Sequence, residues 1–138
     1  MLIWSSKLHR ELPDFLKLED QSFFEMVTAT RKELLHVEGS AFQIELFHLS
    51  EDDFDQERFA NRLPCEYTDE VTTFLPKVED VIVQKLRWSV GAMRQKDFDD
   101  VVSILRVHEP IDFNYIESWC EKHGSLDHLA EAREAAQG

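Results

Sequence analysis

Hydrophobic positions follow two different patterns along the chain. Short apolar runs separated by turn residues occupy much of 33–75, whereas apolar residues recur at spacings of three and four from residue 76 onward. A period of two predicts β-strands and a period near 3.6 predicts α-helices. The sequence therefore predicts an α+β protein, with a small antiparallel or mixed sheet packed on a C-terminal helical bundle.

A β-hairpin is predicted over Glu33–Val37 and Phe42–His48, because a short turn containing Gly39 separates the two runs. If Val37 lies opposite Phe42, side chains alternate between two faces of the second strand. One face is predicted to be core and consists of Phe42, Ile44 and Leu46. The more open face consists of Gln43, Glu45 and Phe47.

An amphipathic helix is predicted over Asp20–Arg31, with Asp20 or Ser22 as its N-cap. The apolar side of this helix would carry Phe23, Phe24, Met26 and Val27.

The middle of the chain predicts a helix followed by a second hairpin. The acidic stretch Ser50–Asp53 is typical of a helix start, and Phe54–Arg62 would supply one or two turns. Leu63–Thr68 and Val71–Leu75 then read as two strands that end before a proline.

Four helical segments are predicted in the C-terminal half of the chain. The first begins just after Pro76 and ends near Gly91, and the second runs over about Gln95–Val107. The third begins after the N-cap Asp112 and ends before Gly124, and the tail over Leu126–Ala136 is the fourth. Short connections between them predict antiparallel packing. We expect a single domain over 1–138, sheet-rich over 1–75 and helical over 76–138.

Composition narrows the classes of function. The chain has 138 residues, 43% of them hydrophobic, with only 4 Gly and 4 Pro, which predicts one folded globular domain. The net charge of -13 disfavours nucleic-acid binding, since a phosphate backbone attracts Lys and Arg. With two cysteines and no long apolar run, the sequence predicts a soluble, cytoplasmic protein without a membrane partner.

Three stretches of the second half resemble a known family. The first stretch, Val78–Trp88, has a Glu-Asp pair before two apolar residues and then a Lys-Leu. The second, Arg94–Val101, has two aspartates three residues apart, and the third, Ile111–Trp119, has an Asp-x-x-Tyr helix. This order resembles the C-terminal half of minimal nucleotidyltransferase-like proteins, a bacterial group that includes toxins of toxin-antitoxin and abortive-infection systems. The resemblance covers roughly residues 14–124 and implies a shortened nucleotidyltransferase-like fold.

The resemblance also singles out one carboxylate. Ala41–Phe47, followed by the acidic Asp52–Asp55, resembles the strand that carries the third metal-binding carboxylate of the family, and Glu45 stands where the family usually has Asp. Family members also use a Gly-Ser turn and an Asp-x-Asp pair to hold two magnesium ions. No glycine precedes Gly39 here. We therefore expect a non-catalytic binding or regulatory module as this chain, with no cofactor.

An enzymatic alternative stays open. The catalytic segment would then lie upstream or on a partner chain, and Glu45 would become the third ligand in a magnesium-dependent nucleotidyl transfer. Under this alternative Mg²⁺ is the cofactor.

Two interpretations compete for the candidate site residues. A vestigial metal or nucleotide site would consist of Glu45, Gln43 and Lys85. In the simpler interpretation, Glu45 is a solvated strand residue and Lys85 belongs to a structural ion-pair cluster that joins two helices. That cluster consists of Lys85, Lys96, Asp97 and Asp100.

Other candidate ligands do not make a convincing metal site. One helical turn cannot converge all three carboxylates of Asp97, Asp99 and Asp100. Cys120 and His123 stand three residues apart, with His128 as a third ligand, but the sequence supplies no fourth. We assign no metal to these residues.

The expected partner is a second copy of the chain. A shortened sheet would expose a strand edge and apolar surface, which a second copy readily covers, so a homodimer is predicted. A competing prediction rests on charge, because residues 51–80 carry 10 acidic and 3 basic groups. This segment would instead contact a basic protein.

Overall fold

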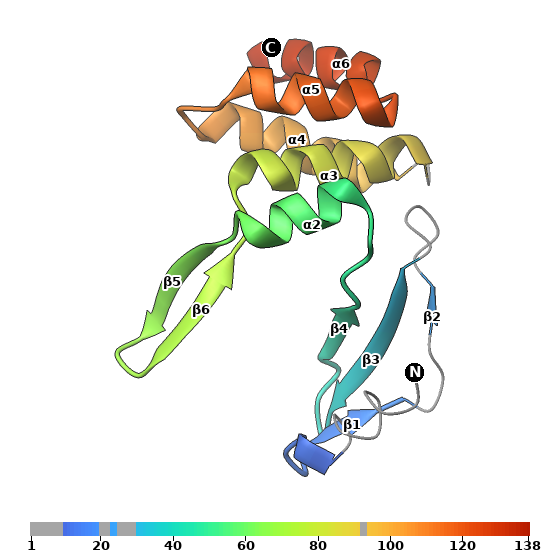
Figure 1. Ribbon diagram of the computed structural model, residues 1–138, viewed down its shortest axis with the longest axis vertical. Helices are drawn as coiled ribbons and strands as arrows, with labels where there is room; N and C mark the ends of the chain where they lie inside the picture. The colour runs from blue at the N-terminus through green and yellow to red at the C-terminus, as the bar shows by residue number, and fades with distance from the viewer. Residues whose placement is uncertain (1–9, 20–22, 25–29, 92–93) are drawn as a thin grey trace. The chain divides into compact units, whose positions relative to one another are not determined.

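The computed structural model in Figure 1 describes the chain except for residues 1–9, 20–22, 25–29 and 92–93. Its class is α+β, with small antiparallel sheets and C-terminal helices, as the sequence predicts. The chain consists of two compact units, an N-terminal unit over Met1–Leu49 and a C-terminal unit over Ser50–Gly138.

The N-terminal unit is an antiparallel sheet built around β3 (Arg31–Val37). One edge of β3 pairs with β4 (Gln43–Phe47). The short strands β1 (Leu16–Leu18) and β2 (Phe23–Phe24) pair with opposite ends of β3. The predicted hairpin of β3 and β4 is thereby confirmed.

The register of this hairpin agrees with the prediction, but its predicted core does not. The Val37 N–H donates to the Phe42 carbonyl at 3.2 Å. Phe42 is nevertheless 71% exposed, and Ile44 is also exposed, so the assignment of this face of β4 to the core is wrong. Leu35, opposite Ile44 on β3, is buried. The central strand is covered, whereas β4 lies at the edge of its sheet and is covered less.

The predicted helix over Asp20–Arg31 is wrong where the structure describes it. Phe23 and Phe24 form β2 and pair with Lys32 and Arg31 of β3. Backbone hydrogen bonding to a neighbouring strand here overrides the helical spacing of the apolar residues. The remaining predicted positions lie outside the described residues, including Asp20, Ser22, Met26 and Val27.

The C-terminal unit contains the predicted helices almost residue for residue. They are α2 (Asp53–Ala60), α3 (Val78–Gly91), α4 (Gln95–Val107), α5 (Phe113–His123) and α6 (Leu126–Gln137). Local capping explains the boundaries of α5, because the Asp112 carboxylate accepts from the Tyr115 N–H at 3.1 Å. At its other end Gly124 adopts φ 69°, a left-handed conformation that favours glycine.

The hydrophobic core of this unit gathers around α3, which packs against α4, α5 and α6. Phe54 anchors α2 to it, with its ring centroid 5.1 Å from that of Trp119. Trp119 is therefore a core residue. The buried apolar residues of the core are Phe54, Ile82, Val83, Leu86, Val101, Val102, Ile116, Trp119, Cys120, Leu129 and Ala132.

The second predicted hairpin is confirmed with the predicted strand boundaries. β5 (Leu63–Thr68) and β6 (Val71–Leu75) form a separate two-stranded antiparallel sheet. Within the C-terminal unit, the hairpin projects away from the helices as an arm (Figure 1).

Candidate functional site

The most unusual surface of the C-terminal unit is the arm formed by β5 and β6. Its large apolar side chains are between 50% and 77% exposed. A folded protein normally covers most such groups, and exposed apolar groups that gather on one element, instead of standing singly, mark an interaction site. We call this set the hairpin surface, and it consists of Leu63, Tyr67, Val71, Phe74 and Leu75.

The two edges of the arm differ in their protection against strand pairing. On β5, Pro64 lacks a backbone donor, Glu66 carries a charge, and the register is irregular between Glu66 and Thr68. β6 reads Val-Thr-Thr-Phe-Leu, with no charge and no proline. Within the described chain, β6 pairs with β5 alone. The β6 edge is thus open to another strand.

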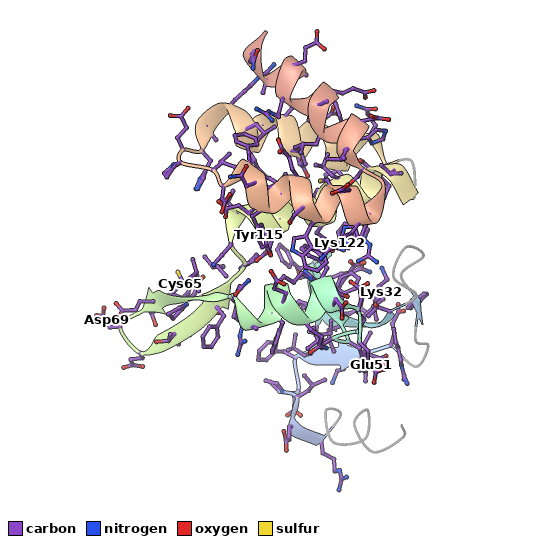
Figure 2. The ribbon with its side chains drawn as sticks, turned by 45° about the horizontal axis from the view of Figure 1, so that its top comes forward. Lys32, Glu51, Cys65, Asp69, Tyr115 and Lys122 are labelled. Carbon is purple, nitrogen blue, oxygen red and sulfur yellow. The ribbon has the colours of Figure 1, made fainter. Side chains whose placement is uncertain are left out.

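A cavity of about 800 Å³ lies beside the base of the arm. The arm contributes Leu63, Cys65 and Leu75, and α3 and α4 contribute Val78 and Ile104. Figure 2 shows Cys65 partway along the arm and Asp69 at its tip. The cavity adjoins the hairpin surface and extends its apolar character toward the helices.

The side of the arm that carries Phe74 is braced by an arginine. The Arg62 guanidinium carbon lies 4.0 Å from the centroid of the Phe59 ring and 4.7 Å from that of Phe74. Cation–π contacts of this kind hold exposed rings in place without burying them. Phe74 is therefore positioned yet still half exposed.

The predicted residues of a vestigial metal site are engaged in other contacts. The Lys32 ammonium donates to Glu45 Oε1 at 2.7 Å. Gln43 Nε2 lies 3.3 Å from His36 Nδ1. Glu45 and Gln43 are exposed on β4, in the N-terminal unit, whereas Lys85 belongs to α3 of the C-terminal unit.

Lys85 lies among the aspartates of the predicted ion-pair cluster. Its ammonium donates to Asp97 Oδ1 at 3.2 Å and to Asp100 Oδ2 at 2.7 Å, which joins α3 to α4. Burial disfavours the charged form of Lys85, but the hydrogen bonds that its ammonium donates to Asp100 and Asp97 together outweigh burial and raise the lysine pKa. Arg94 Nε also contacts the buried Asp97, at 2.9 Å. Lys96 is exposed and adds a positive charge near Asp100.

Cys120, His123 and His128 serve the packing of the helices. Cys120 is fully buried, and burial raises the pKa of its thiol. His123 packs against the rings of Phe54 and Trp119, and burial lowers its pKa. His128 Nδ1 lies 3.1 Å from the Ser89 hydroxyl. No group of three or more metal-ligating side chains occurs within the described ranges.

Sequence reasoning missed two polar contacts between helices. Tyr115 of α5 donates its hydroxyl proton to the buried Asp80 of α3. Arg87 of α3 donates two hydrogen bonds to the Asp52 carboxylate, at 2.9 and 3.2 Å. Each pair is 35 residues apart in sequence, so local spacing gives no signal for it. Only the charged residues inside the apolar stripe of α3 hint that partners exist.

Comparison with known proteins adds no assignment. No family model, curated protein or solved structure matches this chain. None of the helices described here is long and apolar enough to cross a membrane.

Proposed function

We propose that the chain is a non-catalytic binding module that contacts another protein through its hairpin surface, and that the contacted protein is a second copy of the chain. The observation that supports this proposal is the exposure of Leu63, Tyr67, Val71, Phe74 and Leu75 on a single two-stranded arm.

Physical chemistry favours coverage of this arm. Burial of apolar surface stabilises an association by about 25 cal/mol per Å². A two-stranded hairpin is also only marginally stable in water, whereas three or more strands with an apolar face are stable. A partner that adds a strand to the arm supplies both kinds of stabilisation.

The resemblance to nucleotidyltransferase-like proteins supports the proposal that this chain has a shortened form of their fold. In the enzymatic alternative Glu45 would bind Mg²⁺, and the ion would compete with the Lys32 ammonium that now contacts this carboxylate. Lys85 would contact a phosphate in place of Asp97 and Asp100. We therefore keep this alternative as an outcome of the test.

The test is a calorimetric titration of the protein with ATP, GTP, CTP and UTP in the presence of Mg²⁺. It is repeated with Glu45→Ala and with the control Glu38→Ala, which removes another exposed carboxylate of the same unit. The proposal expects no nucleotide binding by any of the three proteins. Binding that Glu45→Ala abolishes and Glu38→Ala preserves would contradict it and favour the enzyme.

A second measurement addresses the partner. Analytical ultracentrifugation of the protein alone is expected to show reversible dimers. If the chain stays monomeric but binds a basic protein through residues 51–80, the prediction of self-association is wrong and the charge-based interaction is favoured.

A further inference from the structure

We propose that two copies pair through their β6 edges, antiparallel to each other, around a two-fold axis at Thr73. This inference rests on the proposed function and specifies the surface and the register. The result would be a continuous four-stranded sheet in which β5 and β6 of one copy are followed by β6 and β5 of the other.

The first argument is the contrast between the available strand edges. Natural edge strands are protected against pairing by charges, prolines or bulges. β5 has Pro64 and Glu66, and β4 of the N-terminal unit has Glu45. β6 has neither a charge nor a proline across Val71–Leu75. Of these three edges, β6 is the one on which a second strand meets least resistance.

The second argument is the register, which follows from symmetry. A two-fold axis makes every contact reciprocal, and Thr73 is the midpoint of β6. Only an axis at this residue pairs all five residues of the strand. Thr73 then faces Thr73 of the second copy, Val71 faces Leu75, and Thr72 faces Phe74. Such threonine and aromatic–threonine pairs are favourable across antiparallel strands.

The third argument is charge complementarity at the ends of the strand. In the register centred on Thr73, the turn residue Asp69 at the tip of one arm falls near Lys77 at the base of the other, just beyond the ends of the paired strands. Symmetry produces this opposite-charge pair twice. Glu70 lies opposite an uncharged residue, Pro76, so no like charges meet directly. Two copies of a strongly acidic chain can thus approach here without local repulsion.

The fourth argument is the apolar face that pairing would create. Alternation places Val71, Thr73 and Leu75 on one face of β6, and their partners on β5 include Leu63 and Cys65. Two copies would join these faces side by side. The contact is nevertheless small beside the roughly 1,200 Å² of a typical stable interface. We therefore expect a reversible dimer with a dissociation constant on the order of micromolar.

The experiment is sedimentation velocity of the full chain at concentrations from about 1 to 500 µM, which bracket a micromolar constant. Thr73→Lys places two lysines opposite each other at the axis. It should raise the dissociation constant about fivefold or more. The control Glu66→Lys places a lysine on the same arm, but on β5 and outside the hairpin surface, and should leave the constant unchanged. Circular dichroism checks that both variants fold.

Charge reversal tests the register independently. Asp69→Lys and Lys77→Asp should each weaken the dimer by about two- to tenfold. The two single variants change the net charge in opposite directions, so a general charge effect cannot weaken both. The double variant restores opposite charges in every reciprocal pair, and we expect it to dimerise like the original chain.

The possible failures are distinguishable. Dimers that withstand Thr73→Lys but are lost in Glu66→Lys would overturn the β6 pairing and leave self-association in place. A double charge variant as weak as either single variant would overturn the register. A monomeric original chain over the whole range would overturn self-association together with the pairing, whereas the nucleotide titration tests the non-catalytic assignment separately.

Discussion

The Tyr115 hydroxyl donates to Asp80 Oδ1 at 2.6 Å and joins α5 to α3 inside the C-terminal unit. Asp80 is only 1% exposed, so its carboxylate has lost hydration by water and accepts a hydrogen bond from the Tyr115 phenol instead. A buried carboxylate needs hydrogen bonds to remain charged at low cost. The pair is therefore a contact on which the stability of the bundle depends.

Removing the phenol should destabilise the bundle. In Tyr115→Phe the Asp80 carboxylate loses its donor while it stays buried, so we expect the free energy of unfolding to fall by about 1–3 kcal/mol. Urea denaturation measures the difference. Tyr67→Phe removes an exposed hydroxyl from the arm and should change the unfolding free energy by less than about 0.5 kcal/mol. Equal losses in the two variants would contradict the role given to Asp80.

The same carboxylate predicts a pH dependence. Burial raises the pKa of Asp80 above its ordinary value of 3.8, although the hydrogen bond from Tyr115 opposes the shift. The folded chain then binds more protons than the unfolded chain between pH 3.8 and the raised pKa. The contribution of Asp80 to stability is therefore greatest below pH 3.8 and declines as the pH rises through the raised pKa.

Asp80→Asn isolates this effect, because the amide oxygen can still accept from Tyr115 but cannot ionise. Relative to the original chain, the variant should gain stability as the pH rises from 3.8 through the raised pKa of Asp80. Unfolding free energies measured at a series of pH values would show the trend. Two parallel curves would mean that Asp80 does not titrate as its burial predicts.

Asp52 should stabilise α2 in two ways. Its carboxylate caps the helix by accepting a hydrogen bond from the Asp55 N–H, and the same carboxylate forms an ion pair with Arg87. Asp52→Ala should therefore lower the free energy of unfolding by about 0.5–2 kcal/mol. The control Asp53→Ala removes an adjacent exposed carboxylate, and thermal denaturation compares the two variants. A larger loss in Asp53→Ala would contradict the capping role.

The hydrogen bond from Arg87 lowers the pKa of Asp52 despite partial burial. A lowered folded pKa means that the contribution of Asp52 is fully present above pH 3.8 and is lost as the pH falls through the lowered value. The difference between Asp52→Ala and the original chain should consequently shrink in acid. A difference that stays constant down to pH 2 would contradict this linkage.

Lys85 should be structural. Lys85→Ala leaves the buried Asp97 with Arg94 as its remaining cation, so we expect a loss of about 1–3 kcal/mol in unfolding free energy. Lys96→Ala removes a nearby exposed lysine and should have an effect below about 0.5 kcal/mol. Chemical denaturation distinguishes them. If Lys85→Ala left stability intact, the interpretation of Lys85 as part of a helix-joining ion pair would be wrong.

Much of the C-terminal unit could be predicted because its signals are local. The carboxylate of Asp112 and the left-handed Gly124 define the two ends of α5 within its own sequence. Turn residues between Thr68 and Val71 similarly define the second hairpin. Such boundaries depend on neighbouring residues, which a reader of the sequence can see.

The failures arose where distant residues decide the structure. Phe23 and Phe24 have helical spacing, yet their pairing with β3 makes them a strand. The exposure of Phe42 depends on the position of β4 at the edge of its sheet, and the pairing of Asp80 with Tyr115 depends on how α3 and α5 pack. None of these can be inferred from periodicity alone.

The most direct test of the account is a disulfide across the proposed axis. Thr73→Cys is made together with Cys65→Ser, because Cys65 is the partner of Thr73 within the same hairpin and would capture the new thiol. Directly opposed residues of antiparallel strands have Cα atoms about 4.5–5.5 Å apart, within the range of a disulfide. The control is Glu66→Cys in the same background, an exposed position on β5 outside the hairpin surface. Under mild oxidation at micromolar concentration, we predict covalent dimers of the Thr73→Cys protein and few of the control. Equal cross-linking of the two, or a Thr73→Cys protein that remains monomeric, would contradict the account.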